Sequence, residues 1–157
     1  MIKLIMYNDM YQKSLENYPL SQEQLSFTAH PLELLERADI HASYTPIIIT
    51  EDDKVAGFFV LDTGDDKFHY TDIEGSILLR GYSIHPDHQG RGIAQESMKL
   101  LNIFITKQFP DVKIIVLGVN EANKAAQAVY IKSGFNDEGR RFNGRSGIQI
   151  AMVKKFV

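Results

Sequence analysis

The stretch from Tyr82 to Ala94 holds the residues best suited to bind a ligand. A predicted strand ends at Ile84, a short polar loop follows, and a predicted helix opens at Gly90-Arg91-Gly92. Free backbone N–H groups at the start of a helix bind anions, and the helix dipole adds to this attraction. Glycines let the backbone approach a bulky phosphate, and the arginine adds a positive charge. The pattern indicates a binding site for a pyrophosphate group.

Two common phosphate-binding motifs are absent from this loop. A Walker loop would need Gly-Lys-Ser/Thr, and a dinucleotide fingerprint would need a third glycine at the position that Gln95 occupies. An isolated Gly-x-Gly also fits a flexible loop before a helix. The loop alone therefore leaves the identity of the ligand open.

A wider pattern resembles a known family. Gln89-x-x-Gly92-x-Ala94, opening a long helix after a strand, resembles the Gln/Arg-x-x-Gly-x-Gly/Ala motif of the GNAT superfamily of acetyl-CoA-dependent N-acetyltransferases. Downstream, the segment 123–135 is similar to that family's Asn-x-x-Ala-x-x-x-Tyr…Gly-Phe signature. The two motifs occur in the expected order, with a helix and a strand between them, and cover about residues 76–135.

The resemblance implies acetyl-CoA as cosubstrate and a role for each matching residue. Backbone groups of the strand would pair with pantetheine, the loop would hold the pyrophosphate, and Asn123 would hydrogen-bond the cofactor. Tyr130 would lie near the thioester sulfur. The implied cofactor-binding residues are Tyr82, Ser83, Ile84, Gln89, Gly90, Arg91, Gly92, Ile93, Ala94, Asn123 and Tyr130.

The chemistry of acetyl transfer asks for few protein groups, because the thioester is already activated. A neutral amine attacks the carbonyl directly, a tetrahedral intermediate forms, and the thiolate leaves. A backbone N–H can stabilise the oxyanion. A tyrosine has a reference pKa of about 10, so Tyr130 can act as the general acid that protonates the thiolate. A tyrosine on an apolar helix face also fits simple core filling.

The general base is the least determined part of the predicted site. Some family members keep a glutamate in the strand before the loop, where this chain has Leu78, Leu79 and Arg80. Glu74, at the start of that strand, is the first candidate for the base. The other candidates are Asp72 and His85, and all three also fit ordinary surface positions.

Two glycines lie inside predicted strands, Gly81 before the loop and Gly118 in the following strand. Such glycines often mark a bulge or a close approach of another backbone segment. In the resembling family the two strands splay apart and pantetheine lies between them. The glycines fit either that slot or two ordinary bulges.

Three charged features allow alternative interpretations. Arg80 interrupts an apolar strand and either faces solvent or contacts an anion on the acceptor or a buried acid. His85 and His88 are explained by their loop position, and we predict no metal site. The acidic segment 62–74 either attracts a cationic substrate or is a solvated hairpin end.

The elements that must position these residues follow from periodicity. Strands are predicted over 2–7, 46–50, 55–61, 76–84, 112–119 and 147–156, and helices over 8–17, 31–37, 90–109 and 121–133, with 21–27 ambiguous. This order predicts an α+β fold. With the resemblance, we expect one GNAT-like domain over 1–157, with a mostly antiparallel twisted sheet of six to seven strands, about four flanking helices and splayed strands.

Composition limits the other function classes. The 157 residues carry a net charge of −3, which argues against nucleic-acid binding, and the absence of cysteine excludes disulfides and a cysteine nucleophile. No signal peptide or membrane span is apparent, so we expect a cytoplasmic monomer or homodimer.

The sequence thus predicts an N-acetyltransferase that acts on a primary amine, most simply of a small molecule. The alternatives are a non-catalytic acyl-CoA-binding module, an enzyme that acetylates a protein or peptide amine, and an enzyme that uses another phosphorylated ligand.

Overall fold

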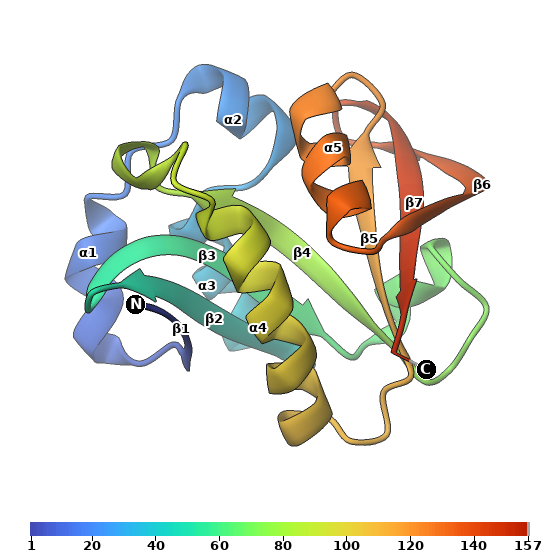
Figure 1. Ribbon diagram of the computed structural model, residues 1–157, viewed down its shortest axis with the longest axis horizontal. Helices are drawn as coiled ribbons and strands as arrows, with labels where there is room; N and C mark the ends of the chain where they lie inside the picture. Colours follow the sequence, from blue (N-terminus) through green and yellow to red (C-terminus); the bar gives the residue numbers. More distant parts are fainter. Residues whose placement is uncertain (157) are drawn as a thin grey trace.

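The computed structural model describes residues 1–156, and its strands form one mixed sheet with the order β1-β2-β3-β4-β5-β7-β6 (Figure 1). The strands are β1 (Ile2–Met6), β2 (Tyr44–Glu51), β3 (Lys54–Asp62), β4 (Ser76–Ile84), β5 (Ile114–Asn120), β6 (Asn136–Gly144) and β7 (Gly147–Lys155). The helices are α1 (Gln12–Glu16), α2 (Gln22–Phe27), α3 (Pro31–Ile40), α4 (Ile93–Gln108) and α5 (Lys124–Lys132). Only the pair β4–β5 is parallel within residues 1–156. The predicted α+β fold is confirmed.

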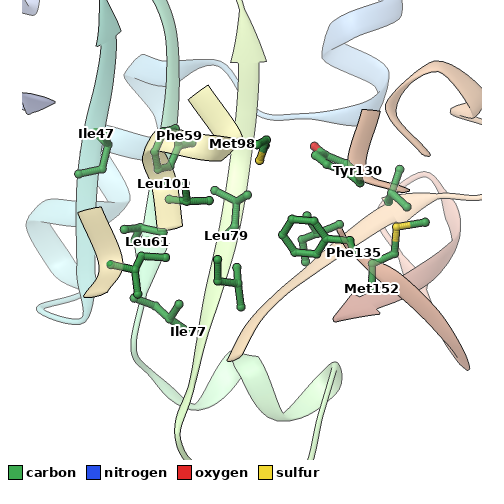
Figure 2. Close-up of a cluster of buried hydrophobic side chains, with 14 of the residues drawn as sticks. Ile47, Phe59, Leu61, Ile77, Leu79, Met98, Leu101, Tyr130, Phe135 and Met152 are labelled. Atoms are coloured by element: carbon green, nitrogen blue, oxygen red, sulfur yellow. The ribbon is translucent and has the colours of Figure 1, made fainter. Parts of the chain in front are cut away.

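Helices cover both faces of the sheet, because side chains alternate along each strand. On one face α4 and α5 pack on the larger core, which Figure 2 shows in part. On the other face α1 and α3 pack on a smaller core that includes Leu15 and Leu34. In β2, for example, Ile47 and Ile49 enter the larger core, whereas Ile48 enters the smaller one.

The C-terminal part of the sheet differs from the sequence prediction. One final strand was expected over 147–156, but the chain forms a hairpin of β6 and β7. The side chains of β6 are mostly exposed, so the strand has no apolar alternation to reveal it. The ambiguous segment 21–27 contains α2, which begins with a capping box between Ser21 and Gln24. The predicted first helix is a 3₁₀ turn, Asp9–Tyr11, followed by α1.

Strands β4 and β5 diverge soon after they meet (Figure 1). Their parallel pairing spans only Ser76–Leu78 opposite Ile114–Val116. Farther along, β4 pairs with β3 as far as Ile84, and β5 pairs with β7 as far as Asn120. We call the region between residues 79–84 and 117–120, where the two strands no longer pair, the splay.

A bulge in β4 lies at the splay. Phe58 of β3 pairs with Ser83 and Val60 pairs with Arg80, so Gly81 and Tyr82 together oppose one residue of β3. Gly81 has φ +66°, and a Cβ there would lie 2.2 Å from Leu34 Cδ1. The positive φ favours glycine, and any larger residue would also force the Leu34 side chain to move.

Gly118 is explained differently. Its pairing with Ala151 of β7 continues a regular register, so β5 has no bulge there. A Cβ at this position would lie 2.8 Å from the ring of Tyr70, which packs edge-on against Phe142. The close approach of an aromatic side chain, which was not predicted, therefore accounts for this glycine.

Candidate active site

The loop that joins β4 to α4 presents unpaired amides at its C-terminal end. Gly92 is the N-cap of α4 with φ +75°, and no side chain caps the helix. The helical ladder begins where Glu96 N donates to Gly92 O. Across the part of the chain that the structure describes, the amides from Gly90 to Gln95 donate to no carbonyl. Such a run of free N–H groups at a helix start has the geometry that can bind an anion.

The rest of the loop is held by hydrogen bonds. Gln89 Nε2 donates to Ile84 O at 3.3 Å, and Asp87 N donates to His85 Nδ1 at 3.0 Å. Glu51, at the end of β2, contacts His88 Nδ1 at 2.6 Å and Arg91 at 2.9 Å. The hydrogen bond with His88 is the main cause that lowers the pKa of Glu51. These contacts fix the loop while the Arg91 guanidinium remains exposed.

The end of β4 is contacted from the face that carries α1, α2 and α3. Tyr18 and Ser83 share a buried hydrogen bond of 3.0 Å, and burial raises the pKa of Tyr18. Gln24 of α2 donates to Ile84 O at 3.3 Å. The sequence analysis did not single out Tyr18 or Gln24, because each lies some sixty residues from its partner along the chain and no local pattern links them.

On the opposite face, Tyr82 of β4 meets Tyr130 of α5, with ring centroids 6.3 Å apart. Ser97 Oγ donates to Ala94 O, so the Tyr82 hydroxyl donates to Ser97 Oγ at 2.6 Å. Tyr82 is thereby attached to the first turns of α4. No sequence motif predicts this role for Ser97.

Tyr130 reaches from α5 toward β4 and lies beside Phe135 (Figure 2). Its side chain is 8% exposed, and its hydroxyl has no hydrogen-bond partner within residues 1–156. Burial raises the pKa of Tyr130, with a smaller contribution from Tyr82. The phenol therefore keeps its proton at neutral pH and can donate it to a group bound at the splay.

Asn123 caps the start of α5. Its Oδ1 accepts from Ala126 N at 3.2 Å. The side-chain amide of Asn123 donates to no group of the described chain, so its N–H groups are available to a ligand. Capping explains why an asparagine starts this helix, and it leaves room for the predicted contact with a cofactor.

The structure does not bring Glu74 to Tyr130. Glu74 is exposed beyond the paired end of β4, eight residues before Tyr82, so about 25 Å of strand separates the two positions. Asp72 is 92% exposed and pairs with Arg140 of β6 at 3.2 Å. His85 lies in the loop, where its ring packs against Tyr18. Glu74 thus lies at the end of β4 that is opposite the splay.

Arg80 binds a buried acid, as one of its alternatives predicted. Its NH1 donates to Asp62 at 3.0 Å and to Asp66 at 2.8 Å, and its guanidinium lies 5.0 Å from the centre of the Tyr44 ring. Asp62 is buried and also accepts from Ser43. Several carboxylates of the acidic segment 62–74 therefore take part in internal ion pairs.

Residues 1–156 contain no helix with the length and apolar character needed to cross a bilayer.

Comparisons with known proteins agree on one family. The model of the acetyltransferase (GNAT) family matches residues 7–135. The uncharacterized N-acetyltransferase YbbJ of Bacillus subtilis (strain 168) is 34% identical over 152 residues, which cover 96% of this chain and 95% of that protein.

Solved structures with the same fold include an aminoglycoside acetyltransferase, AAC(6')-Ib, in complex with coenzyme A and kanamycin. Its TM-score is 0.80 at 17% identity, with 99% of this chain and 95% of that chain covered. The spermidine N-acetyltransferase from Vibrio cholerae in complex with CoA and spermine has a TM-score of 0.72 at 20% identity, with 98% and 95% covered. At these identities the likeness shows the fold.

Proposed function

Because the chain belongs to the acetyltransferase (GNAT) family, whose acetyl donor is acetyl-CoA, we propose that it acetylates a primary amine of a small molecule. Two proteins with the same fold support the size of the acceptor, since their structures hold kanamycin and spermine. The observation that carries the proposal is the splay, which opens beside the unpaired amides at the start of α4 and beneath the Tyr130 hydroxyl.

The residues around the splay fit coenzyme A. The amides from Gly90 to Gln95 and the guanidinium of Arg91 would hold the diphosphate. His85 N donates to Ala56 O, so by the alternation of antiparallel pairs Ser83 faces Phe58 of β3, whereas the backbone groups of Tyr82 and the N–H of Ile84 would turn toward pantetheine. The same pairing directs the backbone of Ser83 away from the splay. The carbonyl of Ile84 already accepts from Gln24 and Gln89. Asn123 would donate its side-chain amide to the cofactor from the start of α5.

The proposed reaction is direct transfer. The amine nitrogen bonds to the acyl carbon, the carbon–sulfur bond breaks, and the sulfur takes the proton of the Tyr130 hydroxyl. A backbone N–H of β4 at the splay would stabilise the charge that develops on the acyl oxygen. The proton that the amine loses passes to water, because Glu74 lies at the far end of β4. The protein thus contributes position, an oxyanion donor and one general acid.

Tyr130→Phe is the direct test. We expect kcat to fall by about 100-fold or more, as is usual when a general acid is removed, with CoA affinity within about twofold. The stability of the fold should not change, because the lost hydroxyl has no partner in residues 1–156. Thiol release measures turnover, and calorimetric titration measures CoA binding. Unchanged turnover would exclude Tyr130 as the acid.

A panel of amines with acetyl-CoA tests the class of acceptor. It contains polyamines, aminoglycosides, amino acids and peptide N-termini, and thiol release is the readout. We expect turnover with small amines and little with peptides. Turnover with peptides alone would contradict a small-molecule acceptor. CoA binding without turnover on any amine would identify a binding module.

A further inference from the structure

The bend formed by residues 88–92, between β4 and α4, is weakly tied through its backbone. Within residues 1–156, neither Gly90 nor Arg91 takes part in a hydrogen bond between backbone groups. Gly90 and Gly92 have positive φ, and a Cβ added at either would have no atom within 4 Å. Glycine leaves the backbone more conformational freedom than any other residue. Side chains must therefore hold this bend in one conformation.

Three side-chain hydrogen bonds hold the bend, and two of them end on one atom. Glu51 Oε1 accepts from Arg91 Nη1 at 2.9 Å and from His88 Nδ1 at 2.6 Å. The third is a longer bond of 3.3 Å, from Gln89 Nε2 to the carbonyl of Ile84. A single carboxylate thus anchors both ends of the bend.

Glu51 is itself firmly placed. It is the last residue of β2, where it opposes Ile2 of β1 and Lys54 of β3. Its side chain is 19% exposed, and the hydrogen bond with His88 lowers its pKa, so the carboxylate is charged at neutral pH. The Arg91 side chain is 57% exposed, and such exposed ion pairs add little to the stability of a fold. We therefore expect the pair to act on the shape of the bend rather than on folding.

The contact with Glu51 leaves Arg91 able to bind an anion. A guanidinium has five N–H donors in a rigid fork, and Glu51 uses only Nη1. Within residues 1–156, Nε and Nη2 of Arg91 donate to no group, and the amides from Gly90 to Gln95 donate to no carbonyl. Donors that are ordered before a ligand arrives bind it more tightly, because their conformational entropy is already lost.

We propose that Glu51 is a positioning residue that orders the bend and the Arg91 guanidinium for the diphosphate of coenzyme A. The inference rests on the proposed function, which places the diphosphate at this bend. The carboxylate acts through Arg91 and His88 and does not itself contact the ligand. A negative charge near a diphosphate would by itself weaken binding. Positioning and simple repulsion therefore predict opposite effects when Glu51 is changed.

Two variants of Glu51 and one control test this role. Glu51→Asp keeps the charge but withdraws the carboxylate by one methylene, whereas Glu51→Gln keeps the length and removes the charge. Asp53→Asn is the matched control, because it removes a charge from the same turn, forms no ion pair within residues 1–156, and has a φ of +69° that asparagine tolerates. In calorimetric titrations with CoA at physiological ionic strength, we expect each Glu51 variant to lose about tenfold in affinity and the control less than twofold.

Steady-state kinetics separate positioning from a catalytic role. With an amine that the panel identifies as an acceptor, KM for acetyl-CoA should rise about tenfold in Glu51→Asp, while kcat and KM for the amine stay within about twofold. The double variant of Glu51→Asp with Arg91→Ala should lose less affinity for CoA than the product of the two single losses, because Glu51 acts through Arg91.

Three results would overturn this role of Glu51: unchanged CoA affinity in Glu51→Asp, tighter CoA binding in Glu51→Gln, or single losses that multiply in the double variant. Each of these leaves the proposed function intact, because the wild type still binds CoA. If the wild type binds no CoA, the proposed function and the role of Glu51 fail together.

Discussion

Replacing Gly81 by alanine should destabilise the protein by two separable effects. Gly81 has φ +66°, a conformation that costs an L-residue about 1–2 kcal/mol. The new Cβ would also lie 2.2 Å from Leu34 Cδ1, and Leu34 is buried in the smaller core with little room to move. Overpacking of this kind costs about 1–3 kcal/mol. We therefore expect a loss of about 3 kcal/mol, or a fall in Tm of about 6–12 °C for a chain of this size.

Three further variants separate these effects. Gly90→Ala has the same handedness, φ +77°, but no atom lies within 4 Å of the added Cβ, so it should cost about 1 kcal/mol. Leu34→Ala removes the clashing side chain, so the double variant with Gly81→Ala should be more stable than the sum of the two single losses by about 1–3 kcal/mol. Denaturant melts of the wild type and the four variants measure these free energies of unfolding. Additive losses, or equal losses for the two glycine variants, would refute the contact with Leu34.

Three other predictions follow from single features. Arg80→Leu leaves the buried Asp62 without its cation and should cost about 3–5 kcal/mol in a denaturant melt, whereas Arg37→Leu, in an exposed helical pair, should cost at most about 0.5 kcal/mol. Burial raises the pKa of Tyr18, Tyr82 and Tyr130, so above about pH 10 the folded state keeps protons that the unfolded state loses. These groups should leave the free energy of unfolding unchanged below that pH, and the free energy should fall as the pH rises beyond it. The fall should be less steep in Tyr130→Phe. Gly92→Glu places a bulky anion at the start of α4 and should abolish the thermal shift produced by CoA, and a retained shift would place the diphosphate elsewhere.

The sequence predicted the central elements because their patterns are local. The apolar stripe of α4 recurs every three or four residues, and the all-apolar run of β5 marks a strand buried on both faces. The loop between β4 and α4 was visible for the same reason, since its glycines and Gln89 lie within a few residues of one another. An element or a loop can be predicted from the sequence when all the residues that define it lie within one short segment of the chain.

Strand β6 was missed because its stability comes from distant backbone pairing. It pairs with β7 at the edge of the sheet, and most of its side chains face solvent. A register shift between Asp137 and Arg141 further interrupts any alternation. The partner of Arg80 was equally hidden, because Asp62 lies eighteen residues away, across a turn. The pairing of β6 and the ion pair of Arg80 both join residues that come together only when the sheet has formed.

The position of the site follows from connectivity. A parallel pair needs a crossover, so α4 must begin at the edge where β4 ends and return the chain to the start of β5. Strand β5 then ends at that same edge, and α5 begins beside it. The splay, the unpaired amides at the start of α4 and the capping Asn123 therefore gather at one edge, with Tyr130 on the helix that Asn123 begins. The same reasoning places Glu74 at the other edge, because the residue before a strand lies at the opposite edge from the residue after it.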